Sequence, residues 1–279
     1  MSLKIFYIRE LFNIPHLANS PLLVFFLSVL TLSASVWFGN IVLSRFRTKD
    51  TETSSDLGII QSATLTLLAL IIGFTFSMSI ARYDLRQNYE EAEANAIGTE
   101  FLRSDLLPSK NAEAVKALLN DYVDQRILFY SKQDQETAKQ ITKRTLELQN
   151  ALWNEVLTAA RMQPSPTIAL AVSGMNDVIN TQGYTQAAWW NRIPRAAWWL
   201  MGAIAISANM LVGFGARNFK NNISLFMIFP IMISVAFFLI ADIDSPRGGI
   251  IRIEPRNLID LKQNISMQNS SVLSIGTPR

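Results

Sequence analysis

The sequence predicts an all-α membrane protein with four spanning helices and a cytoplasmic helical bundle inserted between spans two and three. Charged residues make up 17% of the chain, against roughly a quarter in soluble domains. The deficit is concentrated in charge-free blocks, each about as long as the roughly twenty residues that carry a helix across a bilayer. Four such blocks are too long and too uniform for core helices of a soluble protein. They are residues 21–44, 57–81, 196–216 and 221–241.

These blocks divide the chain into five segments. The N-terminal segment carries apolar residues interrupted by Lys4, Arg9 and Glu10, which suits either a short helix on the membrane surface or a disordered tail. No stretch shows the sustained alternation of a strand. The expected domains are 1–20 (N-terminal interfacial segment), 21–81 (spans one and two), 82–195 (cytoplasmic helical domain), 196–244 (spans three and four) and 245–279 (C-terminal tail).

The second span is expected to continue as one helix into water. Its charge-free part, Leu57–Ala81, is followed without a proline by a charged stretch that ends at Pro108. The residue before a proline leaves the α region, so the helix should stop there. This long helix connects the membrane to the cytoplasmic domain.

Two faces of the second span are expected to have different roles. The spacing of Ala69, Gly73 and Ser77 predicts a face on which helices pack closely in lipid. The opposite stripe changes from weakly polar to apolar to basic, which fits either lipid contact with snorkelling arginines or a pore wall with an apolar constriction. The candidate pore-lining residues are Thr64, Leu68, Ile71, Thr75, Met78, Arg82 and Arg86.

Three further helices are expected in the cytoplasmic domain, over residues 109–130, 133–161 and 167–182. Pro164 and Pro166 separate the last two, and Gly183 is expected to end the third. The Trp-rich segment 187–199 is expected to mark re-entry into the membrane, because indoles favour the headgroup region. A stacking site for a ligand is the alternative.

The fourth span ends in two aspartates and a Pro-Gly-Gly turn. Asp242 and Asp244 are expected either to pair with Arg247 and end the helix, or to form a cation site or a charged ring at a channel mouth. The Ser- and Asn-rich tail after Asn264 is expected to be disordered.

Several functional classes are excluded by composition. The chain has no Cys and one His, His16, so thiol chemistry and a His-based zinc site are excluded. A net charge of +3 is too small to indicate a nucleic-acid partner. No nucleophile–base pair or metal-ligand cluster appears, so we expect neither an enzyme nor a bound metal or cofactor.

The distribution of Lys and Arg predicts the orientation of the chain in the membrane. Four spans place both termini and the inserted domain on one face, and that face carries the excess of basic residues near the membrane. By the positive-inside rule it is the cytoplasmic face.

Four local motifs resemble the bestrophin-like family of bacteria, formerly a domain of unknown function. They are RYDLR at 82–86, EANAIGT at 93–99, LRSDLLP at 102–108 and DIDSPRGG at 242–249. The resemblance extends over residues 20–262, and the layout is distantly similar to that of bestrophin ion channels.

The resemblance implies a homopentamer with a central ion pathway whose hydrophobic neck is lined by the second span. Carried over, the neck positions are Leu68, Ile71, Thr75 and Met78. Asp242 and Asp244 would stand where animal bestrophins bind calcium, but Pro246 and Arg247 follow at once, so calcium regulation is not expected. The expected function is an oligomeric channel for small ions, weakly favouring anions through Arg82 and Arg86. A non-conducting membrane scaffold that acts through its cytoplasmic domain is the alternative.

Overall fold

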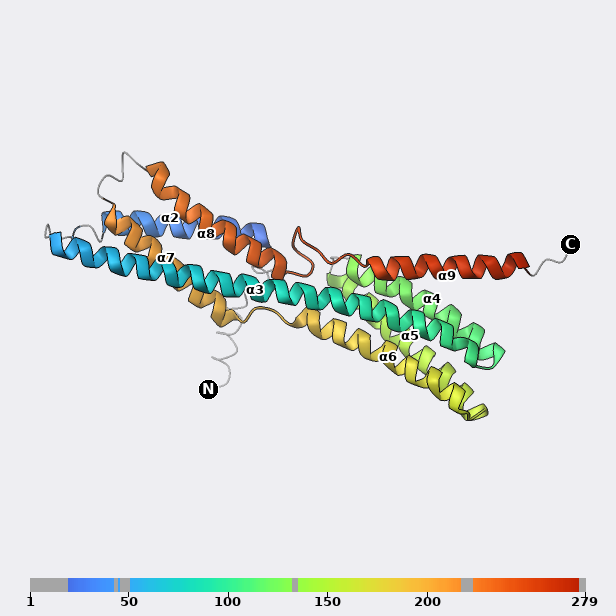
Figure 1. Ribbon diagram of the computed structural model, residues 1–279. Coiled ribbons are helices and arrows are strands. Elements are labelled where there is room, and N and C mark those ends of the chain that lie inside the picture. Colours follow the sequence, from blue (N-terminus) through green and yellow to red (C-terminus); the bar gives the residue numbers. More distant parts are fainter. Residues whose placement is uncertain (1–19, 43–44, 46–50, 132–134, 217–222, 276–279) are drawn as a thin grey trace, which may run out of the picture. The chain divides into compact units, whose positions relative to one another are not determined.

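The computed structural model describes residues 20–42, 45, 51–131, 135–216 and 223–275, and within these ranges it is helical with no strand. Figure 1 labels the elements. The principal helices are α2 (Pro21–Ile41), α3 (Thr51–Arg103), α4 (Ser109–Ser131), α5 (Gln135–Met162), α6 (Pro166–Trp190), α7 (Arg195–Gly215), α8 (Ile223–Asp244) and α9 (Arg256–Ile275), with a short 3-10 turn, η2 (Ser104–Leu106), after α3.

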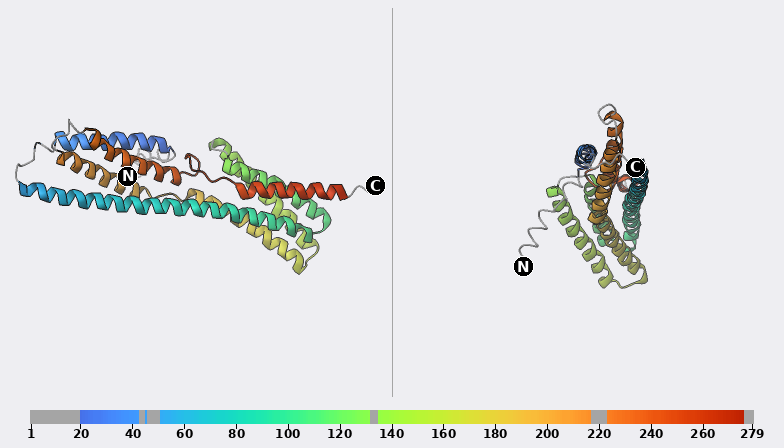
Figure 2. Two further views of the ribbon diagram at one scale, coloured as in Figure 1. Left: turned by 45° about the horizontal axis from the view of Figure 1, so that its top comes forward. Right: turned by 90° about the vertical axis from the view of Figure 1, so that its left-hand side faces the viewer.

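The chain forms two compact units. The first, which we call the apolar unit, comprises Met1–Tyr83 and Arg192–Arg252; the second, the polar unit, comprises Asp84–Asn191 and Ile253–Arg279. Helix α3 is a single helix of 53 residues that contributes to both, and Figures 1 and 2 show it uninterrupted. The prediction that the second span continues as one helix beyond its apolar part is confirmed.

The apolar unit is built around α2, α7, α8 and the N-terminal part of α3. Helix α2 packs against both α7 and α8. The buried core takes residues from all four helices, so each helix turns one side toward a common centre. Core residues include Leu32, Leu68, Met201, Ala205, Ala208, Phe237 and Ile240.

A pair of glycines lets α2 and α7 approach closely. A Cβ atom on Gly39 would collide with the backbone carbonyl of Met210, and a Cβ on Gly213 would collide with that of Val36. Beside this crossing, the Asn40 side-chain amide donates to the carbonyl oxygens of Gly213 (3.3 Å) and Ala216 (3.1 Å). The Asn40 amide thus binds two carbonyl oxygens at the C-terminal end of α7, where a helix leaves carbonyl groups without helical partners.

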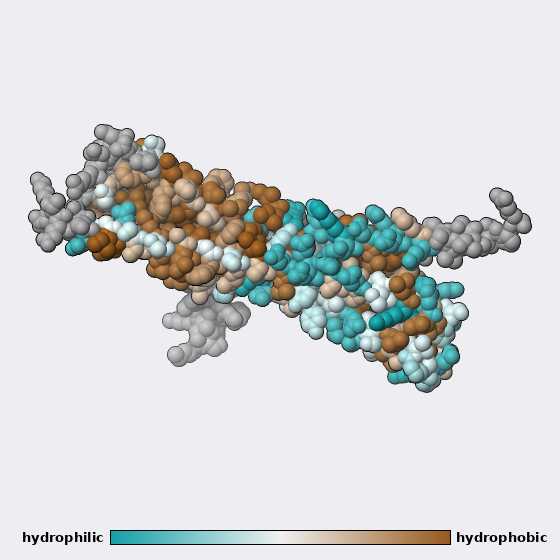
Figure 3. All heavy atoms as spheres, in the orientation of Figure 1, coloured by the Kyte–Doolittle hydropathy of each residue, from teal (hydrophilic) through white to brown (hydrophobic). Residues whose placement is uncertain are grey.

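Four candidate spans within the described residues are long and apolar enough to cross a membrane. They lie within Pro21–Ile41, Asp56–Leu106, Pro166–Gly215 and Phe226–Asp244. Figure 3 shows apolar residues covering the surface of the apolar unit and hydrophilic residues over much of the polar unit. The chain is therefore a membrane protein, and each charge-free block overlaps one of these four candidates. We call Leu57–Ala81, the charge-free part of α3, its spanning part.

The polar unit packs α4 against α5, α5 against α6, and α9 against α4. Its core consists of apolar residues at helical spacing, including Val115, Leu119, Leu152, Val156, Ala171, Met175 and Val178. Ser165 caps the N-terminus of α6, because its hydroxyl accepts a hydrogen bond from the backbone N–H of Ile168 at 3.2 Å. The three helices expected between Ser109 and Gln182 are confirmed in kind and order.

Two predicted ends in this unit are wrong. Helix α6 does not end at Gly183 but continues to Trp190; a single glycine costs a helix only about 1 kcal/mol, which packing readily offsets. The tail after Asn264 was expected to be disordered, but α9 continues through it to Ile275, the last described residue. The interfacial helix predicted for residues 1–20 lies outside the described residues, except for Ser20.

The Trp-rich segment has a more varied role than membrane re-entry. Trp189 is 5% exposed and packs inside the polar unit, with its ring 4.7 Å from that of Phe129 and 5.5 Å from that of Tyr130. Trp190, the next residue, is 75% exposed. Of this adjacent pair, therefore, only Trp190 is free to meet headgroups, and Trp189 is a core residue.

Candidate functional site

Within the single chain, the spanning part of α3 buries much of the stripe that was predicted to line a pore and leaves the small-residue stripe exposed. Leu68 is 2% exposed and belongs to the core cluster formed with α7 and α8, and Ile71 packs against the same cluster. Thr75 is also buried, and its hydroxyl donates to the carbonyl of Ile71 at 2.8 Å. Leu68 and Thr75 therefore pack within their own chain and have almost no free surface with which to line a pathway.

The small-residue stripe is the free face in a single chain. Ala69, Gly73 and Ser77 are all exposed, and a Cβ atom added at Gly73 would meet nothing within 4 Å. These residues were predicted to pack against other helices, and no described helix of the same chain covers them. Within Leu57–Ala81 both stripes are free of charge, so hydropathy alone does not distinguish the side that is buried in the chain from the side that is exposed.

The remaining residues of the predicted pore wall lie in different environments. Thr64 is half-buried near the start of the span, and its hydroxyl donates to the Ile60 carbonyl at 2.8 Å. Met78 is 42% exposed. Arg82 lies beside the end of α8, with its Nη1 atom 3.7 Å from Oδ1 of Asp244. Of the seven residues, Met78 retains the most open position.

Arg86 is a structural residue of the polar unit. Its side chain is 1% exposed, and its Nε and Nη2 atoms donate to the carbonyl oxygens of Ala188 and Asn191, both at 3.1 Å. These carbonyls lie at the C-terminal end of α6, where a cation is favoured by the helix dipole. In the single chain the Arg86 guanidinium group is buried against α6, so a place at the mouth of a pore stays a prediction that these contacts do not support.

The two aspartates after the fourth span organise the turn that follows it. Asp242 accepts hydrogen bonds from the backbone N–H groups of Ile250 (2.7 Å) and Ile251 (2.8 Å). A side chain at Gly249 would collide with the Asp242 carboxylate, so only glycine fits there. Asp244 accepts from the backbone N–H of Ile193 at 3.2 Å. Both carboxylates are buried and bind backbone groups, which favours the turn role over a cation site.

Arg247, the third residue of that predicted site, is half-buried. Burial lowers the pKa of the Arg247 guanidinium, and the like charge of Arg192 lowers it further. Within the described residues, no group of three or more His, Asp or Glu side chains is arranged to hold a metal ion.

An ion pair at the centre of the polar unit was not predicted. Glu93 of α3 is 0% exposed and accepts hydrogen bonds from Arg126 of α4, from the Tyr130 hydroxyl (3.4 Å) and from the Thr185 hydroxyl (3.2 Å). The Arg126 guanidinium also lies 4.4 Å from the centre of the Phe129 ring. One signal was available: Arg126 continues the spacing of Val115, Leu119 and Tyr122, so it lies on the apolar face of α4.

A second carboxylate of α3 binds the start of α9. Glu90 accepts from the Leu258 backbone N–H at 3.0 Å and from the Asn257 side-chain amide at 2.6 Å. Burial raises the pKa of the Glu90 carboxyl, although these hydrogen bonds oppose the effect. A carboxylate at this position satisfies free N–H groups at the N-terminus of a helix.

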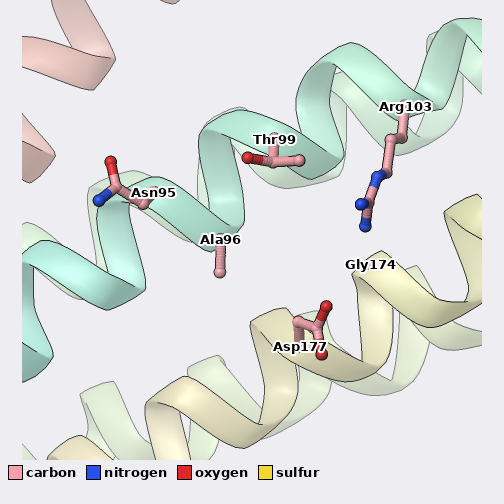
Figure 4. A pocket seen from close by; sticks show the side chains of 6 residues that line it. All are labelled: Asn95, Ala96, Thr99, Arg103, Gly174 and Asp177. Carbon is pink, nitrogen blue, oxygen red and sulfur yellow. The ribbon is translucent and has the colours of Figure 1, made fainter.

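A small polar hollow lies between α3 and α6 (Figure 4), with a volume of about 280 Å³. Its lining residues come from two turns of α3 and one turn of α6: Asn95, Ala96, Thr99, Arg103, Gly174 and Asp177. The side chains of Arg103 and Asp177 approach it from opposite helices.

Comparison with known proteins identifies the family. The model of the Bestrophin-like domain matches residues 25–258. A bacterial bestrophin homologue from Klebsiella pneumoniae, solved as a single-residue variant, superposes with a TM-score of 0.59 and 14% identity, covering 89% of this chain and 98% of that chain. A further structure of the homologue, solved by zinc phasing, has a TM-score of 0.57 and 15% identity, covering 87% and 98%.

No curated protein matches the sequence. At these identities the structural likeness establishes the fold, whereas the family model covers most of the chain, including α3 and the turn after α8. The chain belongs to the bestrophin-like family.

Proposed function

We propose that this chain is one subunit of an oligomeric ion channel, in which copies of α3 surround a central pathway for small ions. One observation carries the proposal: the spanning part of α3 buries one side in its own chain and leaves the opposite side uncovered. Ala69, Gly73 and Ser77 on that side allow helices of neighbouring subunits to approach closely. Family membership and the bestrophin fold support the same reading.

The constriction belongs to the exposed apolar residues beside the small-residue stripe. Leu70, Phe74 and Met78 are 52%, 64% and 42% exposed, and their spacing of four residues places them along one side of α3. An apolar ring of this kind gates by excluding water. We therefore assign the neck to Leu70, Phe74 and Met78. Of the residues first expected there, Leu68, Ile71 and Thr75 are no longer included.

Neither arginine supports a preference for anions in the way that was first expected. Arg86 is bound to carbonyl groups of α6, and Arg82 has Asp244 close by. We therefore propose a pathway for small ions in which these side chains do not select the sign. A reversal potential measured in a salt gradient determines the selectivity directly.

The proposed assembly is a homopentamer in the bacterial inner membrane, with the polar unit and both termini on the cytoplasmic side. The excess of Lys and Arg on that side of the spans supports this orientation. Membrane lipid and small ions are then the natural partners of the apolar unit.

The decisive experiment compares two apolar residues that differ in burial. Purified full-length protein is reconstituted in planar bilayers, and single-channel conductance is recorded for the wild type, Phe74→Ala and Leu68→Ala. We expect Phe74→Ala to raise the conductance, because it widens the free face. Leu68→Ala should leave the conductance of folded channels unchanged and lower their thermal stability. The absence of current from wild-type oligomers in any salt would refute the proposal, as would a monomer in mild detergent.

A non-conducting scaffold is the second candidate, and exposed apolar residues in the polar unit favour it. Leu102, Met162 and Leu170 are 60%, 72% and 51% exposed, which suits contact with another protein. A stable oligomer without current, and without a continuous lumen in its experimental structure, would decide for this function.

A further inference from the structure

Glu100 is a buried carboxyl group that lacks the partners its neighbours possess. It lies on α3 and is 0% exposed, yet neither of its oxygens has a hydrogen-bond partner among the described residues. Glu90 and Glu93, on the same helix, are buried to the same degree but each accepts several hydrogen bonds. The hydrogen bonds that stabilise the Glu90 and Glu93 carboxylates are therefore lacking at Glu100 among the described residues.

The surroundings of Glu100 are closely fitted. A Cβ atom on Gly174 of α6 would collide with Oε2 of Glu100 and would lie 2.7 Å from Nη1 of Arg103. With any other residue at position 174, the Glu100 carboxyl group would have to move from the place it occupies here. The charged groups that face it are Arg103 from α3 and Asp177 from α6, and both line the hollow in Figure 4.

Electrostatics then favour the protonated form of this carboxyl group. An ionised carboxylate without donors is strongly unfavourable in a buried site, and adding a proton removes the charge. Burial raises the pKa of Glu100 to about 8; the positive charge of Arg103 opposes this, and the negative charge of Asp177 adds to it.

We propose that Glu100 is a proton-binding site, at which α3 and Gly174 of α6 pack around a neutral carboxylic acid at neutral pH and separate locally when the acid ionises in alkaline solution. The only bond broken is the O–H bond, and the proton passes to solvent. Because α3 also runs through the membrane, the site lies on the helix that forms the proposed pathway. The proposal that Glu100 binds a proton does not require that the protein conducts ions.

The sign of the effect on stability follows from proton binding. The folded chain holds this proton up to a pKa of about 8, whereas the unfolded chain releases it near the ordinary value of 4.5. Folded protein therefore binds the additional proton between these values, and its stability should fall as the pH rises through this range. Above it, the contribution of Glu100 is lost.

Infrared spectroscopy on the full-length protein tests the proposal directly. We expect the carbonyl stretch of a protonated carboxylic acid at pH 7, absent in Glu100→Gln and lost from the wild type with a midpoint near pH 8. Glu91→Gln is the matched control, because Glu91 lies exposed on the same helix; this variant should retain the band. A wild-type spectrum with no such band at pH 7 would overturn the proposal, as would a band that persists in Glu100→Gln.

Two charge variants make the test independent of whether Glu100→Gln folds. Asp177→Asn removes a neighbouring negative charge and should lower the midpoint of the band, whereas Arg103→Met removes a positive charge and should raise it. If Glu100 only filled space, the two substitutions would not shift the midpoint of the band in opposite directions. Equal midpoints in both variants, or shifts of the reverse sign, would refute the assignment, whatever current the channel carries.

Discussion

The apolar unit and the polar unit hold parts of the same helix, α3, by different means. In the apolar unit, the buried polar side chains of α3 are the hydroxyls of Thr75 and Ser79, which bond to their own helix, as Ser79 does to the Thr75 carbonyl at 3.0 Å, and close packing provides the other contacts. In the polar unit, α3 buries ionisable side chains, and Glu93 is matched by Arg126.

This difference follows from the surrounding solvent. Lipid offers no gain from sequestering apolar surface, so helices in a membrane associate through close packing and small residues. Water drives apolar burial in the polar unit, which leaves room for a few charged groups provided that they are paired. Three predictions test whether the two units depend on these two kinds of contact.

The largest effect is expected from breaking the buried ion pair. Arg126→Ala leaves the Glu93 carboxylate buried without its cation, which costs about 3–5 kcal/mol. Thermal and urea unfolding of the full-length protein in detergent measure the loss. Arg144→Ala is the control, because the Arg144–Glu147 pair is about half exposed and such pairs contribute about 0.2–1 kcal/mol. Equal losses in the two variants would contradict the central role of the pair.

A smaller effect is expected where the two glycines of the apolar unit meet the backbone of the facing helix. Gly213→Val places methyl groups where the Val36 carbonyl lies, and overpacking costs about 1–3 kcal/mol. The loss is measured as a lower thermal midpoint in detergent. Gly202→Ala serves as the control, since a Cβ atom added at Gly202 of α7 would meet nothing within 4 Å. A Gly213→Val protein as stable as wild type would show that α2 and α7 do not depend on this approach.

The smallest effect concerns a cap in the polar unit. Ser165→Ala removes the acceptor for the Ile168 N–H at the start of α6, at a cost of about 1 kcal/mol. Ser165→Gly should cost only a few tenths of a kcal/mol, because glycine leaves the N–H accessible to water. Hydrogen exchange of the first turn of α6 distinguishes the two variants, and the reverse order would rule out capping by the hydroxyl.

Much of the fold was predictable because the signals are local. The charge-free blocks, the prolines at 108, 164 and 166, and the apolar periodicity between Ser109 and Gln182 indicate helices without reference to their neighbours. Two helix ends were predicted wrongly, and each error has a physical reason. Gly183 has open space around it and does not end α6, and the polar composition after Asn264 does not prevent α9 from continuing to Ile275.

The candidate site was only partly predictable. Asp242 and Asp244 were expected to act in a turn or at an ion site, and the backbone N–H groups that they bind come from residues 193, 250 and 251. Sequence spacing does not reveal the contact with Ile193, which lies far away along the chain. Glu100 was overlooked because an isolated glutamate in a charged helix normally faces water.

By itself, the sequence determined that α3 crosses the membrane and continues into a charged helix, because length and charge decide both. Which side of that helix turns inward was decided only by tertiary structure. Leu68 and Gly73 are equally free of charge, so the inner side is chosen by shape: Leu68 packs into the core cluster that includes Met201 and Ile240, whereas a Cβ atom added at Gly73 would meet nothing within 4 Å. Packing therefore leaves the small-residue stripe uncovered and buries the side first expected to line the pore.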